Sequence, residues 1–281
     1  SLMSYVLAIC IQCSHEIFKI TALIANNFLC RPLMVWAAMR KARVCSTNVT
    51  QNFHANILHK CYMRWQMKTV FVHGWGGDAH YWQDLVPLLS FEEPEFVELG
   101  FTGLAPSMPF IGDEKAVFVT HSLGTLFALK NYQKNIAGLI SINGFTAFKD
   151  FTDERVLKAM QLGLKKDPLK QMQRFYLSAD MKPSKDLDAE RLEEGLEWLK
   201  NWDQSAAFET LQDHAVPILA IVGEQDKIVP IKAVKEQLGN VTAHEQAGHN
   251  IAQQYPQWCA EQIKRFVKEE LNGWKLATTG R

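Results

Sequence analysis

Short apolar runs alternate with helical stretches over residues 67–271, and this alternation limits the possible folds more than any other feature of the sequence. An apolar run of a few residues is typical of a buried strand. Strands that alternate with helices favour an α/β fold, in which helices cover both faces of a parallel sheet. The predicted strands comprise residues 69–73, 95–99, 116–120, 137–142, 216–222 and 241–246, and the predicted helices include residues 81–89 and 256–271.

The interval between the fourth and fifth predicted strands is unusually long. It contains about seventy residues without a strand signal, is rich in Lys, Glu, Leu and Met, and is interrupted at Pro168 and Pro183. Two ordinary crossover helices joined by a long loop would be one explanation. A single crossover does not need so much chain. We therefore expect an inserted helical cap over about residues 146–212.

Residues 1–66 differ in composition from the rest of the chain. Of the 30 basic and 30 acidic residues of the protein, they hold seven basic residues and one acid, together with five of the six cysteines. This change predicts an N-terminal extension, of uncertain status, ahead of one domain over residues 67–281. We expect the extension to have no part in the chemistry, although an acid-poor, Arg-containing sequence is also typical of a transit peptide.

Several other classes of protein are not expected. The pair Cys10 and Cys13 has no second pair to complete a zinc site. His73, His80 and His121 lack the helical spacing of metal ligands, so we expect neither a metal nor a cofactor. The apolar runs near the N-terminus are too short to span a bilayer. The formal net charge is zero, and no nucleic-acid partner is expected. With so few cysteines after residue 66, the domain is predicted to be cytoplasmic.

Ser122 is the candidate nucleophile. The apolar run at residues 117–119 leads to Ser122, and Gly124 and helical sequence follow it. Strand, tight turn and helix in this order form a nucleophile elbow, in which the helix N-terminus supplies N–H groups behind the serine. Thr120 occupies the position where the usual pattern has glycine, which predicts a wider or rearranged elbow. The alternative is an ordinary serine turn after a buried strand.

A serine nucleophile needs a base to take its proton and an acid to orient that base. Asp226 follows the fifth predicted strand, at the carboxyl edge of the sheet where sites of α/β proteins form. Glu224 is a rival closer to the strand but more exposed, and Asp213 lies at the opposite edge. His249 follows the sixth predicted strand. The order Ser, Asp, His is the one expected for such a triad, so the sequence predicts Ser122, Asp226 and His249.

The oxyanion hole is predicted at the sequence His-Gly-Trp-Gly-Gly, residues 73–77, after the first strand. Glycines let the backbone approach a ligand and direct N–H groups toward it. We expect the donors to be the N–H groups of Trp75 and of Leu123, which follows the nucleophile. His73 is expected to brace this loop, and His121 to face the pocket or solvent.

These residues together resemble the α/β-hydrolase superfamily and, within it, the pimeloyl-[acyl-carrier protein] methyl ester esterases of biotin biosynthesis. The resemblance covers roughly residues 69–267. It implies a serine carboxylesterase that forms an acyl-enzyme and needs no cofactor. The chain departs from those esterases at Thr120 and Thr125, which replace glycines, and by the lack of a helix over residues 107–115. A general short-chain carboxylesterase or thioesterase is the alternative, and a non-catalytic binding protein of the same fold is a more distant one.

In the resembling family, basic cap residues bind the acidic carrier protein. This implies that Lys170 and Arg174, one helical turn apart, form half of a carrier-binding surface, with Arg191 in the other half. Phe175 would then line the acyl channel. The other interpretation of these charges is an ordinary solvated helix face. The sequence predicts no oligomeric state.

Overall fold

The computed structural model describes residues 68–89, 91 and 93–271. They fall within the compact unit Trp65–Arg281. The predictions made for residues 1–66 therefore lie outside the described residues.

A six-stranded parallel sheet forms the centre of the unit, with the strand order β2-β1-β3-β4-β5-β6. The α/β fold predicted from the sequence is confirmed, and each predicted strand is present, with its ends displaced by no more than two residues. The carboxyl ends of β1 and β3 are neighbours at the point where the strand order reverses, which is where sites form in open parallel sheets. The strands are Lys68–Val72 (β1), Glu95–Val97 (β2), Ala116–His121 (β3), Ile136–Ile142 (β4), Ile218–Gly223 (β5) and Val241–His244 (β6).

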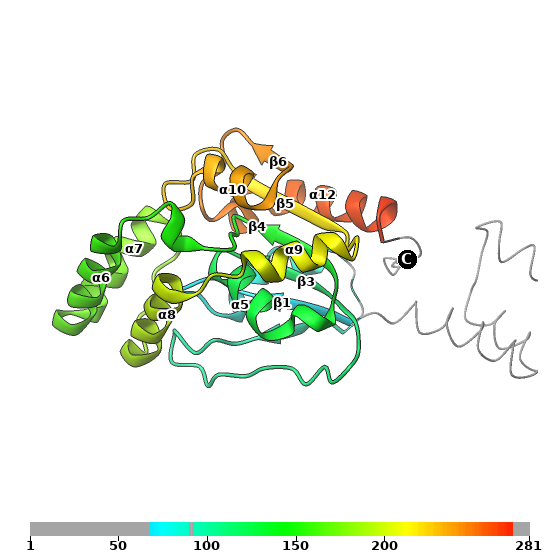
Figure 1. The fold of residues 1–281 in the computed structure, drawn as a ribbon. Helices are drawn as coiled ribbons and strands as arrows, with labels where there is room; N and C mark the ends of the chain where they lie inside the picture. Colours follow the sequence, from blue (N-terminus) through cyan, green and yellow to red (C-terminus); the bar gives the residue numbers. More distant parts are fainter. Residues whose placement is uncertain (1–67, 90, 92, 272–281) are drawn as a thin grey trace, which may run out of the picture. The chain divides into compact units, whose positions relative to one another are not determined.

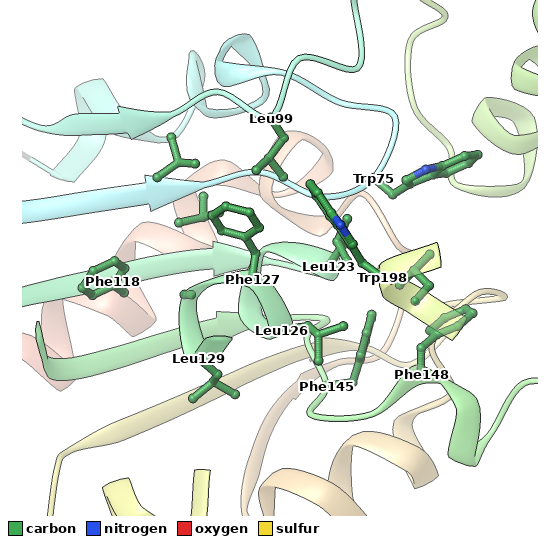
Figure 2. Packing of buried hydrophobic residues seen from close by; sticks show 14 of the residues in the cluster. Trp75, Leu99, Phe118, Leu123, Leu126, Phe127, Leu129, Phe145, Phe148 and Trp198 are labelled. Carbon is green, nitrogen blue, oxygen red and sulfur yellow. The ribbon is translucent and has the colours of Figure 1, made fainter. Parts of the chain in front are cut away.

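Buried side chains form one hydrophobic cluster on each face of the sheet, because successive residues of a strand point to opposite faces. Phe118 packs in one cluster, whereas its neighbours Val117 and Val119 pack in the other. Helix α5, Leu123–Tyr132, contributes Leu126 and Leu129 to the first cluster (Figure 2). The helices that follow α5, β5 and β6 in the chain include the 3₁₀ helix η2 (Gln133–Asn135), α10 (Ile231–Leu238), α11 (Ile251–Gln254) and α12 (Pro256–Glu269).

The single helix predicted over residues 81–89 is wrong. The chain forms a 3₁₀ helix, η1, at Ala79–Trp82 and a short helix, α4, at Val86–Leu89, with a turn between them. Pro87 explains the interruption, because proline has no N–H to donate inside a helix and its ring clashes with the preceding turn. The apolar residues Trp82, Leu85 and Leu89 are buried as the helical pattern required. That burial is achieved without a continuous helix.

The long interval between β4 and β5 is helical, as predicted. After a 3₁₀ turn, η3 (Phe148–Asp150), it contains α6 (Glu154–Lys166), α7 (Pro168–Ser178), α8 (Ala189–Asn201) and α9 (Ser205–Asp213). Helices α6, α7 and α8 lie together at one side of the sheet (Figure 1). Asp153, Asp167 and Asp188 each accept a hydrogen bond from a backbone N–H of the helix that follows, which fixes where α6, α7 and α8 begin.

No helix in the described residues has the length and apolar content needed to cross a bilayer.

Candidate active site

The turn between β3 and α5 has the geometry of a nucleophile elbow. Ser122 is the single residue between the two elements and has φ 52° and ψ −122°, a conformation that a non-glycine residue rarely adopts. Its N–H donates to the carbonyl of Ile142 on β4, at 2.9 Å. Glycine is required at Gly124, where a Cβ atom would lie 2.3 Å from the carbonyl oxygen of Val72. Backbone strain of this kind persists only where the surrounding structure holds it, and it is common at active sites.

Two threonines replace glycines around this elbow, and a chain of hydroxyl groups accommodates them. The Thr120 Oγ1 lies 2.8 Å from the Thr125 Oγ1 and donates to the carbonyl of Ile140, while the Thr125 Oγ1 lies 2.9 Å from the Ser141 Oγ. Gly144 leaves room for them, since a Cβ atom there would lie 2.0 Å from the Thr125 Oγ1. The two threonines are therefore accommodated by hydrogen bonds among the residues around the elbow, and Ser122 keeps its strained conformation.

Asp226 and His249 meet as the sequence predicted. The His249 Nδ1 lies 2.7 Å from the Asp226 Oδ2, and both residues are buried. The Asp226 Oδ1 accepts hydrogen bonds from the backbone N–H groups of Ile228 and Val229. Because the carboxylate oxygen accepts, the hydrogen of the neutral imidazole lies on Nδ1 and the lone pair on Nε2, the tautomer that a general base needs. The rival acid Glu224 is exposed.

The glycine-rich loop after β1 passes directly beside the elbow. A Cβ atom at Gly74 would lie 3.1 Å from the Ser122 Cβ and 2.8 Å from the His121 Nδ1, so a side chain there would displace the nucleophile. Trp75 follows in this loop and is buried, and Leu123 is the first residue of α5. Both predicted oxyanion donors thus belong to segments next to Ser122.

Two cap helices hold this loop. The Tyr176 hydroxyl, on α7, donates to the Gly76 carbonyl at 2.8 Å, and the indole Nε1 of Trp75 donates to the Leu192 carbonyl on α8 at 2.9 Å. Phe175 packs edge-on against the Trp75 ring, with centroids 4.6 Å apart. Burial raises the pKa of Tyr176 to about 12, so the hydroxyl keeps its proton and remains a donor.

His73 braces the start of the loop, as expected. Its Nδ1 contacts the Gly74 carbonyl at 2.9 Å. Beneath it, the Glu98 carboxylate accepts from the backbone N–H groups of Gly100 and Ala79. Burial acts to raise the pKa of Glu98, but the His73 ring and the two N–H groups outweigh it and hold the pKa below its usual 4.5. The carboxylate therefore remains charged and ties the two ends of the loop together.

The expectation that His121 faces the pocket or solvent is wrong. Its ring is buried and stacks on Tyr81, with centroids 4.3 Å apart and an interplanar angle of 18°. Its Nε2 donates to the backbone carbonyl of His249 at 3.0 Å. Burial, and next the nearby His249, hold the pKa of His121 well below its usual 6.5. His121 is therefore a neutral residue of the interior.

The predicted carrier-binding residues occupy different environments. Lys170 and Arg174 are exposed on the outer face of α7, whereas Phe175 contacts Trp75 on the inner side. The guanidinium of Arg191 is less free to bind a carrier protein, because it already has a partner in the chain. Its Nε and Nη2 donate to the Leu99 carbonyl at 3.1 and 2.9 Å. These bonds hold α8 against the segment that follows β2.

Sequence reasoning did not predict the contacts that three polar residues make near the site: Asn143, Tyr176 and Asn250. Asn143 contacts the His249 loop, Tyr176 contacts the oxyanion loop, and the Asn250 Nδ2 donates to the Asp180 carbonyl beyond α7. Asn143 had a signal, an Asn-Gly pair directly after a strand. Tyr176 and Asn250 had none, because their partners are distant in the sequence. Among the residues that the structure describes, no group of His, Cys, Asp and Glu could hold a metal ion.

The comparison with known families agrees with this geometry, since the family model of the alpha/beta hydrolase family matches residues 69–262. The chain belongs to the alpha/beta hydrolase family. A pimeloyl-[acyl-carrier protein] methyl ester esterase from Legionella pneumophila is 28% identical over 195 residues, which cover 60% of this chain and 79% of that protein.

Solved structures share the fold at lower identity. An esterase from Exiguobacterium antarcticum superposes with a TM-score of 0.57 and 16% identity, over 72% of this chain and 92% of its own. An enol-lactonase from Burkholderia xenovorans does so with a TM-score of 0.56 and 14% identity, over 72% of this chain and 92% of its own. At these identities the likeness concerns the fold.

Proposed function

We propose that this α/β-hydrolase is a carboxylic ester hydrolase that uses Ser122 as nucleophile, His249 as base and Asp226 as the orienting acid. The observation that carries the proposal is the 2.7 Å contact between the His249 Nδ1 and the Asp226 Oδ2. This contact leaves the His249 Nε2 as the basic nitrogen, and the elbow presents Ser122 beside the same loops. A nucleophile, a base and an orienting acid are the three roles that acyl transfer requires.

The reaction follows from these roles in two steps. The His249 Nε2 takes the proton of the Ser122 hydroxyl as Oγ attacks the ester carbonyl, and the N–H groups of Trp75 and Leu123 stabilise the oxyanion. The alcohol leaves with the proton from His249, and an acyl-enzyme remains. His249 then takes a proton from water as the water attacks the acyl-enzyme, and it returns that proton to the Ser122 Oγ as the bond between Oγ and the acyl carbon breaks and the acid is released. Asp226 stabilises the charged imidazole in both steps.

For the substrate, we propose the methyl ester of pimeloyl-acyl-carrier protein, hydrolysed in biotin biosynthesis with release of methanol. Support comes from the similar protein of Legionella pneumophila, whose name states this activity. Further support comes from Lys170 and Arg174, two exposed cations on one face of α7. An acidic carrier protein would be attracted to this face, while Phe175 on the inner side would contact the acyl chain.

Charge reversal on α7 tests this proposal. The variant Lys170→Glu/Arg174→Glu is expected to lower kcat/KM for the carrier-linked ester about tenfold, because exposed charge pairs contribute up to about 1 kcal/mol each. Hydrolysis of a free short-chain methyl ester should not change. The matched control is Lys264→Glu/Lys268→Glu, which reverses two cations at the same spacing on α12. An equal loss for both substrates would contradict docking on α7.

A general short-chain carboxylesterase or thioesterase is the second candidate. One observation favours it: Arg191 is bound to the Leu99 carbonyl, so the proposed carrier-binding surface has two free cations rather than three. Rescue of a biotin-requiring strain that lacks its own methyl esterase distinguishes the two. Growth supports the pimeloyl substrate, and failure despite expression of active protein supports the general esterase.

We also propose the division of the chain that the composition suggested. Residues 1–66 would be an extension without a role in catalysis, and residues 67–281 a cytoplasmic hydrolase domain with a cap over about residues 146–212. A truncated protein that starts at Met67 should hydrolyse a free ester at the rate of the full chain. Loss of that activity would contradict the division.

A further inference from the structure

Asn143 joins the two loops that carry the proposed acid and base. It is the first residue after β4, is fully buried and has a φ of 47°. Its Oδ1 accepts from the backbone N–H of Gly223, three residues before Asp226, at 2.9 Å. Its Nδ2 donates to the carbonyls of Gly248 and His249, at 3.1 and 2.8 Å. One amide therefore spans the distance between the end of β5 and the His249 loop.

His121 holds the same carbonyl from another direction. Its Nε2 donates to the His249 carbonyl at 3.0 Å, and its own position is fixed by the stack on Tyr81. His121 is also the residue directly before Ser122 on β3. The His249 carbonyl thus accepts from two side chains. One belongs to His121, which precedes Ser122 in the chain, and the other belongs to Asn143, which is hydrogen-bonded to Gly223 at the end of β5.

The pairing of the sheet does not explain these contacts. The backbone N–H of Asn143 already donates to the Ile221 carbonyl, which extends the β4–β5 pairing without the side chain. A buried amide or imidazole at a strand end lowers stability unless its polar atoms find partners, and the His121 Nδ1 has no hydrogen-bond partner among the described residues. Here two such side chains donate to one loop carbonyl, and that carbonyl belongs to the proposed catalytic base.

We propose that Asn143 and His121 form a carbonyl clamp that positions His249 between Ser122 and Asp226. The clamp rests on the triad proposed above, and neither of its residues touches the substrate. Asn143 sets the separation of the acid and base loops, and His121 sets the separation of the base and the nucleophile. Both are positioning residues. A displacement of about 1 Å in a reacting group costs about 10²-fold in rate.

The test replaces the donors while keeping shape. His121→Phe keeps a ring that can stack on Tyr81 but cannot donate, whereas His121→Gln places an amide N–H near the position of Nε2. Asn143→Asp keeps the size, the left-handed backbone preference and the acceptor for Gly223, but its carboxylate cannot donate. The control is Asn135→Asp, because the Asn135 Nδ2 also donates to two carbonyls, those of Gly112 and Glu114, at the opposite edge of the sheet.

With p-nitrophenyl butyrate as substrate, kcat is expected to fall about 10²-fold in His121→Phe and in Asn143→Asp, with KM changed less than about twofold. His121→Gln should recover most of kcat, and Asn135→Asp should equal wild type. The low-field proton NMR signal of the His249 Nδ1–H should be retained in His121→Gln and Asn135→Asp. The signal should broaden or disappear in His121→Phe and in Asn143→Asp.

Two results would overturn the clamp: wild-type kcat in His121→Phe and Asn143→Asp, or equal losses in His121→Phe and His121→Gln. A thermal unfolding curve for each variant separates loss of folded protein from loss of position, and each clamp residue is tested by its own variant. Ser122→Ala distinguishes the two proposals. If Ser122→Ala keeps wild-type turnover, the triad itself fails, whereas an inactive Ser122→Ala with fully active clamp variants refutes the clamp alone.

Discussion

At the scale of single residues, the site depends on side chains held in unfavourable states by their neighbours. Ser122 keeps a positive φ of 52°, and that conformation costs about 1–3 kcal/mol. The close approach of β1 to Gly124 and the hydrogen bond to Ile142 hold it in place. His121 is buried and neutral beside a second histidine. Each of these costs is sustained at the position where the proposed chemistry occurs.

The buried His121 predicts a pH dependence of stability. Burial, and then the nearby His249, lower the pKa of native His121 well below 6.5, so the unfolded chain binds a proton that the native chain does not. This part of the unfolding free energy is complete above pH 6.5 and is lost as the pH falls from there toward the native pKa. The unfolding free energy should therefore fall as the pH is lowered from about 7.5 to about 5.5.

Urea unfolding of wild type and His121→Gln at both pH values measures the contribution of His121 to the unfolding free energy. The contributions of the other titrating groups cancel when the two proteins are compared. Wild type should lose more of its unfolding free energy than His121→Gln on acidification. Parallel losses in the two proteins would show that native His121 titrates like an unfolded histidine.

The sequence was sufficient to bring the residues of the proposed triad together but not to predict the side chains that hold them. Ser122, Asp226 and His249 each follow an apolar run, so a parallel sheet brings them to one edge whatever the details of the loops. His121 carried no comparable signal. Its partners Tyr81 and His249 are close to it only in the folded chain, and a histidine beside a nucleophile is polar enough to suggest a pocket.

At the scale of helices and strands, the helices between β4 and β5 and the glycine-rich loop after β1 form one assembly. Helix α7 contacts the loop through Tyr176 and α8 through the Leu192 carbonyl. Trp198 of α8 also packs against Phe127 of α5, with centroids 5.6 Å apart (Figure 2). Gly195 allows α8 to lie close to Trp75 and Phe101, since a Cβ atom there would lie 2.6 Å from the Trp75 Cδ1 and 2.9 Å from the Phe101 ring.

We therefore expect Gly195→Ala to lower kcat about tenfold or more, because the added methyl group displaces Trp75 and its N–H from the oxyanion position. Helix propensity alone would instead stabilise α8 by up to about 1 kcal/mol. Esterase kinetics and urea unfolding of the same variant separate the two effects.

Gly163→Ala is the matched control. Gly163 is also a glycine within a cap helix, α6, but the atom its Cβ would meet is the amide oxygen of Gln171, the free end of a flexible side chain. Gly163→Ala should keep wild-type kcat. Equal kcat values for the two alanine variants would show that α8 does not set the oxyanion loop.

Among the secondary elements, periodicity predicted the strands better than the helices. Each strand is an apolar run bounded by turns, whereas the pattern at residues 81–89 could arise from a helix or from a turning loop that buries the same side chains. The structure has the turning segment, which buries Trp82, Leu85 and Leu89. Pro87 was the local signal that a single helix is unfavourable.

At the scale of the whole described unit, topology brings distant parts of the chain to one place. The strand order β2-β1-β3-β4-β5-β6 places the loops after β1, β3, β4, β5 and β6 at the same edge of the sheet. Contacts between the cap and this edge join residues about a hundred positions apart, such as Tyr176 and Gly76. No local sequence pattern encodes such pairs, which is why the helical interval was predicted but its hydrogen bonds to the glycine-rich loop were not.

We propose that Ser122 is the nucleophile of this site. A fluorophosphonate probe reacts with a serine only when a base and an oxyanion hole activate it. Mass spectrometry of the labelled, digested protein should find one adduct, on Ser122, and should find none in Ser122→Ala, whose ester turnover should also fall by at least about 10³-fold while its unfolding curve is unchanged. An adduct on another serine, or persistent turnover in Ser122→Ala, would contradict the account.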